Sequence, residues 1–155
     1  MNIAENATLG FTDGVNTVIS VAAGMVASGQ FTSQQIVIVS IAEAVSGSIS
    51  MGMSRYMSLD GSEHDESAVI ESFMVSCGFV IATLATIIAF STTEKPMVGF
   101  RRSILMTLIV LFIFGYYRSV LLDQNFLYSI GKLLVICIVA TVSTYFIAKR
   151  FDKIS

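Results

Sequence analysis

The sequence predicts an all-α membrane protein built as a bundle of five transmembrane helices. Of its 155 residues, 54% are hydrophobic and only 13% are charged, whereas an average globular domain carries about 25% charge. The mean hydropathy is +0.78, the chain has long apolar runs, and it contains a single proline. This composition excludes a disordered or collagen-like chain, and the net charge of -2 gives no basic face for nucleic acid.

Five apolar stretches each have the length that a membrane-crossing helix needs, which is about 20 residues. They lie at residues 8–28, 34–56, 68–90, 103–120 and 126–148. What remains makes only tails and short connections, so we expect one transmembrane domain over residues 1–155 with sequence neighbours packed antiparallel. The N-terminus lacks a positive charge and Asp13 interrupts the first stretch, so no signal peptide is expected.

The first two stretches differ in composition from the last three. Residues 8–28 and 34–56 are rich in Gly, Ala, Ser and Thr, which let helix backbones approach closely inside a bilayer. The later stretches are rich in Ile, Leu, Val and Phe. We therefore expect the first two helices at the centre of the bundle or at an oligomer interface, and the last three as a lipid-facing wall.

Two carboxylates, Asp13 and Glu43, fall inside the small-residue stretches. An ionised carboxylate at membrane depth costs about 2.5 kcal/mol or more, so it persists only when it is paired, protonated or facing water. Asp13 lies near the start of its stretch, so the alternative to a functional role is that it caps a helix at the membrane interface. Glu43 lies well inside its stretch, which favours a functional site.

Both acids lie on polar stripes, because residues three or four apart share one helix face. The members of the two stripes are Asp13, Thr17, Ser20, Gly24 and Ser28, and then Ser40, Glu43, Gly47, Ser50, Met51 and Ser54. Two such stripes facing each other would form a polar track across the membrane. Polar stripes also hold helices together, so assembly is the alternative interpretation.

Met51 follows Glu43 by eight residues, on roughly the same face. A soft thioether combined with a carboxylate suits borderline transition metals better than Mg²⁺ or Ca²⁺, although methionine also serves as flexible core filler. Asp13, Glu43 and Met51 are therefore the candidate metal ligands of a translocation path. No catalytic group is predicted.

The connection between the second and third stretches is the most charged segment of the chain. The candidate pore-mouth metal ligands are Glu63, His64, Asp65 and Glu66 in this connection, and Glu71, which follows one turn into the third helix. They could concentrate divalent cations there, or form a plain solvated loop with acids at a helix N-terminus. No nucleotide motif is present, and the two cysteines match no zinc or haem pattern, so no tightly bound cofactor is expected.

Two segments carry a resemblance to a known family. Residues 10–24 read GFTDGVNTVISVAAG, and residues 42–56 read AEAVSGSISMGMSRY. They resemble helices 1 and 2 of the vacuolar iron transporter family, and the acid followed eight residues later by Met-Gly is quite specific. The count of five stretches extends the resemblance over nearly the whole chain.

The resemblance implies a homodimer of five-helix protomers in a lipid bilayer. Such a dimer moves Fe²⁺, and often Mn²⁺, out of the cytosol in exchange for protons, and is not an enzyme. By motif position, Asp13, Glu43 and Met51 match the family's translocation-path residues. The alternative function is a non-transporting helical membrane subunit whose polar stripes serve assembly.

The sequence departs from the plant members of the family, which insert a helical metal-binding domain between helices 2 and 3. Here residues 58–67 alone connect them. A metal-collecting site in this place is therefore expected to be absent or reduced to the acidic residues 60–66.

Two arguments disagree about orientation in a membrane that the sequence does not identify. The resemblance implies a cytosolic N-terminus and a cytosolic 58–67 connection, whereas the positive-inside rule favours the side with more Lys and Arg. The family's cytosolic side has Arg55, Arg118 and Lys132, and the other side has Lys95, Arg101, Arg102, Lys149, Arg150 and Lys153. We keep the orientation that the resemblance implies.

Overall fold

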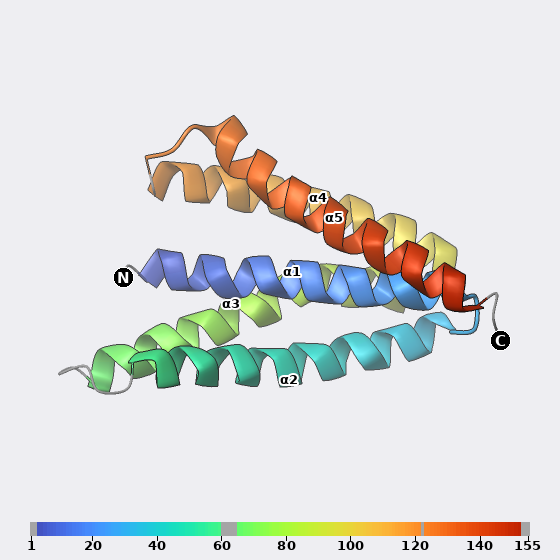
Figure 1. The fold of residues 1–155 in the computed structure, drawn as a ribbon, viewed down its shortest axis with the longest axis horizontal. Coiled ribbons are helices and arrows are strands. Elements are labelled where there is room, and N and C mark those ends of the chain that lie inside the picture. The colour runs from blue at the N-terminus through green and yellow to red at the C-terminus, as the bar shows by residue number, and fades with distance from the viewer. Residues whose placement is uncertain (1–2, 60–64, 122, 153–155) are drawn as a thin grey trace.

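The computed structural model describes residues 3–59, 65–121 and 123–152, and this part of the chain contains helices and short connections but no strand (Figure 1). The helices are α1 (Ile3–Ser28), α2 (Ser33–Leu59), α3 (Asp65–Ser91), α4 (Pro96–Leu121) and α5 (Phe126–Asp152). Each contains a segment long and apolar enough to cross a membrane. The predicted fold class, an all-α bundle of five membrane-spanning helices, is confirmed.

Each helix is longer than its apolar stretch suggested. At 1.5 Å per residue, 26 or 27 residues span about 40 Å, which exceeds the hydrocarbon core of about 30 Å. The largest difference is in α4, which begins at Pro96 rather than at residue 103. Proline suits the first helical position, where its missing N–H is not needed. Arg102, exposed on α4, donates hydrogen bonds to the Thr92 carbonyl (3.1 Å) and hydroxyl (3.0 Å).

Local capping explains why the connections are short. Gly29 ends α1 with a φ of 69°, a left-handed conformation that glycine adopts without strain. Thr32 and Gln35 form a reciprocal capping box at the start of α2, with the Thr32 N–H donating to the Gln35 amide oxygen at 2.9 Å. The Asn125 side chain accepts from the Leu127 N–H at 2.9 Å and caps α5.

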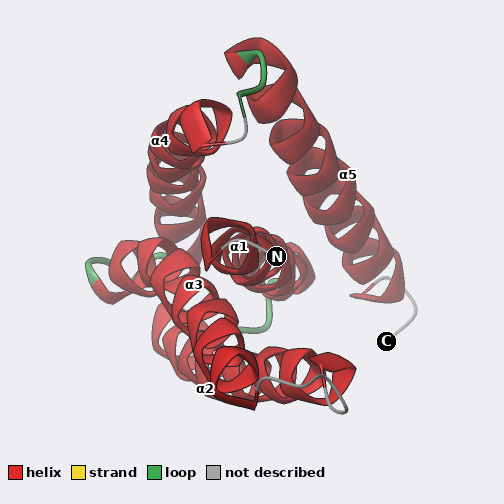
Figure 2. Ribbon diagram, turned by 90° about the vertical axis from the view of Figure 1, so that its left-hand side faces the viewer, coloured by secondary structure: helices red, strands yellow, loops and turns green. Residues whose placement is uncertain are grey.

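Helix α1 lies at the centre of the bundle, with α3, α4 and α5 around it, and α2 packs mainly on α3 with a smaller contact to α1 (Figure 2). Of the two places expected for the first two helices, α1 takes the centre of the bundle and α2 does not, so for α2 the oligomer interface stays a prediction. About half of the α1 and α3 spans is buried, 56% and 50%, against 28% for α2. The sequence did not indicate the buried position of α3, because this helix mixes buried small residues with large lipid-facing ones. Its buried small residues are Ala68, Gly78, Ala82, Ala85 and Ala89.

The backbones of α1 and α3 touch where they cross. A Cβ added at Gly10 would overlap the Val75 carbonyl oxygen, and one at Gly14 would lie 2.6 Å from the Phe79 carbonyl oxygen. Gly78 of α3 approaches the α1 backbone in the same way. Small residues thus let the backbones of α1 and α3 approach each other closely.

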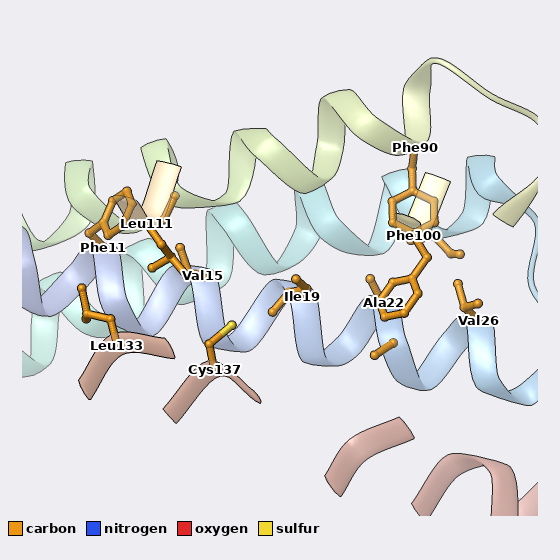
Figure 3. Close-up of a cluster of buried hydrophobic side chains, with 13 residues drawn as sticks. Phe11, Val15, Ile19, Ala22, Val26, Phe90, Phe100, Leu111, Leu133 and Cys137 are labelled. Carbon is orange, nitrogen blue, oxygen red and sulfur yellow. The ribbon is translucent and has the colours of Figure 1, made fainter. Parts of the chain in front are cut away.

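The other face of α1 carries the hydrophobic core (Figure 3). Phe11 stacks on Phe114 of α4 with ring centroids 3.8 Å apart. Labelled core residues come from α1, α3, α4 and α5, namely Phe11, Val15, Ile19, Ala22, Val26, Phe90, Phe100, Leu111, Leu133 and Cys137. The outer surfaces of α4 and α5 expose large apolar side chains, as expected for a lipid-facing wall.

The glycine contact gives a test of the bundle. We expect Gly10→Ala to destabilise the protein by about 1–3 kcal/mol, because the added methyl must push two backbones apart. Gly131→Ala is the matched control, since a Cβ at Gly131 of α5 meets nothing within 4 Å. Thermal unfolding in detergent should show a lower Tm for the first variant only. Equal Tm values would contradict the tight α1–α3 contact.

Candidate functional site

Asp13 is half-buried on α1, on the side that faces away from the core. At about 100° per residue, it lies roughly 200° around the helix from Phe11 and from Val15, which are both buried. Within the described part of the chain, its carboxylate forms neither an ion pair nor a hydrogen bond. Asp13 therefore occupies a membrane-depth surface that its own chain leaves partly open.

Glu43 and Met51 lie at one edge of the α2 surface that packs on α3. The buried residues of α2 are Ser33, Ile36, Ser40, Ala44, Ser48 and Gly52. Glu43, Gly47 and Met51 follow along their flank and are half-buried. The Glu43 carboxylate also has no partner among the described residues.

The exposed surface of α2 is divided into a polar and an apolar side. Beside Glu43 lie the exposed residues Ser46, Ser50 and Ser54, which we call the serine flank of α2. The opposite side exposes Ile41, Val45 and Ile49. Hydrocarbon suits the second side but not the first, because hydroxyls and a carboxylate are costly in lipid.

One chain alone does not close the polar track. Helix α2 packs mainly on α3 and makes a smaller contact with α1, while α1 packs mainly on α3 and α5. In the part of the chain that the structure describes, no group of three or more His, Cys, Asp and Glu residues could hold a metal ion. The stripes of Asp13 and Glu43 instead lie on partly uncovered flanks of two helices.

These residues can perform a definite chemistry. Carboxylates bind both protons and divalent metals, and a metal needs them deprotonated, so the two compete for the same oxygens. The Met51 thioether adds a soft ligand that favours transition metals. The roles of Asp13, Glu43 and Met51 as metal ligands stay predictions.

The predicted pore-mouth residues are described only in part. Glu63 and His64 lie outside the described residues, and Asp65 is described only as the first residue of α3. Glu66 is exposed in the first turn of α3. Glu71 forms an ion pair with Arg55, in which Nη2 and Oε2 are 2.5 Å apart. The pore-mouth site therefore also stays a prediction.

Sequence reasoning missed the role of Arg55, which it counted only as a topological charge. Arg55 lies four residues before the end of α2, and Glu71 lies six residues after the start of α3. Opposite charges at similar depth on adjacent antiparallel helices are a recognisable signal, because ionised groups inside a membrane tend to pair. Fully buried Asn6 of α1, beside Glu71, was also missed.

Comparison with known proteins agrees with this architecture. The model of the VIT family matches residues 4–71 and 59–149, two segments that overlap from the end of α2 into the first turns of α3. No curated protein matches the chain. Members of the family are transporters rather than enzymes, which supports membrane transport of metal ions by this integral, multi-pass protein. Since the match covers most of the chain, and the five membrane-spanning helices agree with it, the chain belongs to the VIT family.

Proposed function

We propose that this protein exports divalent transition metals, Fe²⁺ and also Mn²⁺, from the cytosol in exchange for protons. The observation that carries the proposal is the position of Asp13, Glu43 and Met51, which are half-buried within membrane spans on flanks without a partner from the described chain. In a family of metal transporters, unpaired carboxylates beside a thioether at membrane depth favour a path for the metal.

Exchange with protons follows from the same ligands. A metal that occupies the Asp13 and Glu43 carboxylates leaves when protons occupy them instead. Protons that arrive from the more acidic side of the membrane would therefore release the metal on that side. The energy for export would come from the proton gradient, without a tightly bound cofactor.

A second copy of the chain would complete the path. The serine flank of α2, with Glu43 beside it, is exposed in a single chain and is too polar for hydrocarbon. A twofold dimer places the same surface of each protomer at the interface. This arrangement would bring the stripes of α1 and α2 to a shared, water-accessible path.

Orientation follows the family in this proposal, with the N-terminus in the cytosol. The end of the bundle where α2 ends and α3 begins then faces the cytosol, and the end of α5 lies on the opposite side (Figure 1). Basic residues collect at the C-terminal end, including Lys95, Arg101, Arg102, Lys149 and Arg150, which opposes the positive-inside rule.

A reporter fused after Ser155 tests the orientation. In a bacterial host, we expect an alkaline phosphatase fusion to be active and a green fluorescent protein fusion at the same site to be dark, since five spans put the two termini on opposite sides. The reverse pattern would place the N-terminus outside and overturn export as the direction of transport.

Substitution of Glu43 tests the path. In proteoliposomes with an imposed pH gradient, we expect Glu43→Gln to lower the initial uptake of Fe²⁺ or Mn²⁺ at least tenfold, about 1.4 kcal/mol, because the amide cannot take a negative charge. Glu94→Gln is the matched control, since Glu94 is an exposed carboxylate between α3 and α4.

Two results would count against the proposal. Full uptake by Glu43→Gln would reject the path through this carboxylate. A wild-type protein that moves no divalent metal at any pH gradient would reject transport and favour the alternative, a membrane subunit whose polar stripes serve assembly.

Cysteine crosslinking tests the dimer. In a background without Cys77 and Cys137, we expect Ser50→Cys on the serine flank to form disulfide-linked dimers in membranes after oxidation. Ile109→Cys on α4 is the control, because Ile109 is 52% exposed on the proposed lipid face. Dimers from the control variant alone would move the interface to α4.

A further inference from the structure

The ion pair between Arg55 and Glu71 lies inside the membrane-spanning part of the bundle. From their positions on α2 and α3, the two residues are about 6–9 Å from the helix ends at the α2–α3 connection. Their side chains are 16% and 13% exposed. This guanidinium is therefore a largely buried counter-ion, which holds the Glu71 carboxylate where water and lipid have little access.

A third helix contributes a buried polar side chain at the same place. Asn6 of α1 is 0% exposed, and its carboxamide lies beside the Glu71 carboxylate. Neither its oxygen nor its nitrogen makes a well-formed hydrogen bond to the described residues. A buried carboxamide without any polar neighbour costs about 1–3 kcal/mol, so Asn6 depends on the Glu71 carboxylate beside it.

The side chains of Arg55, Glu71 and Asn6 together resemble a cation site in which the cation is already present. A carboxylate and an amide oxygen are ligands of the kind that divalent cations accept in proteins. The cation present is the guanidinium of Arg55, with its Nη2 on Oε2 of Glu71. Arginine remains protonated at any ordinary pH, so this cation is permanent and attached to the protein.

We propose that Arg55 is a specificity-determining residue, whose guanidinium takes the place of a divalent metal on the Glu71 carboxylate, beside which Asn6 lies. This role rests on the proposed transport function and explains why the chain has an ion pair between Arg55 and Glu71. A path conducts only if ions are bound weakly enough to leave each position. With Arg55 in place, metals do not lodge at this end of the bundle and pass on to Asp13 and Glu43.

The experiment measures Mn²⁺ binding to the purified full chain in detergent, by electron paramagnetic resonance titration. We expect Arg55→Met and Arg55→Gln each to gain one Mn²⁺ site per chain, bound at least tenfold more tightly than any additional Mn²⁺ in the wild type. The gained site should disappear when Glu71→Gln is added to either variant. Arg55→Gln carries the test if Arg55→Met does not fold.

Arg118→Met is the matched control. Arg118 is also half-buried, lies in α4 at the same end of the bundle, and donates to the Ser129 hydroxyl at 3.3 Å rather than to a carboxylate. Its loss removes the same charge without releasing an acid, so no Mn²⁺ site should appear. A purely structural ion pair would lower the Tm of the Arg55 variants without adding a site.

Three results would overturn the inference: unchanged Mn²⁺ binding in both Arg55 variants, a gained site that survives Glu71→Gln, or an equal gain in Arg118→Met. These outcomes are distinct from a failure of the proposed function. Metal uptake by wild-type proteoliposomes tests transport, whereas Mn²⁺ binding to the variants tests the position that Arg55 occupies, and either can fail alone.

Discussion

The backbone contact between α1 and α3 is the constraint on which the rest of the bundle depends. Because Gly10, Gly14 and Gly78 leave no side chain between the two helices, α1 is held against α3 along one side and fills its core-facing side with α4 and α5. Helix α2 packs mainly on α3, where Gly47 and Gly52 let it approach Phe79 and Ser76 closely.

That arrangement determines which polar groups remain uncovered. Once α3 separates much of α2 from α1, the Asp13 side of α1 and the serine flank of α2 face outward from one chain. Their hydroxyls can bond to their own helix, as the Ser46 hydroxyl does to the Ala42 carbonyl at 2.9 Å. An ionised carboxylate has no proton to donate to a carbonyl of its own helix. Asp13 and Glu43 therefore require water, a proton, a metal or a second chain.

The sequence predicted the parts of this structure that depend on composition along the chain. Helix number followed from the length of the apolar runs, and Asp13 and Glu43 do lie inside spans. The arrangement of the helices in space could not be predicted in the same way. It depends on the few glycines that contact the backbone of another helix, and Gly78 of α3 lies among Phe and Val residues in the sequence. The pair of Arg55 and Glu71 was missed because each charge was assigned to a separate role, topology or metal binding.

The deep carboxylates of the spans then fall into two kinds. Of the acids beyond the first turn of their spans, Glu71 has a cation from its own chain, whereas Asp13 and Glu43 have none within the described residues. A paired carboxylate stays ionised and unavailable, but an unpaired one inside a span must be hydrated, protonated or metal-bound. Those last two states are the states between which a metal–proton exchanger alternates. The position of Arg55 thus distinguishes Glu71, which is paired within the chain, from Asp13 and Glu43, the predicted ligands of the proposed exchange.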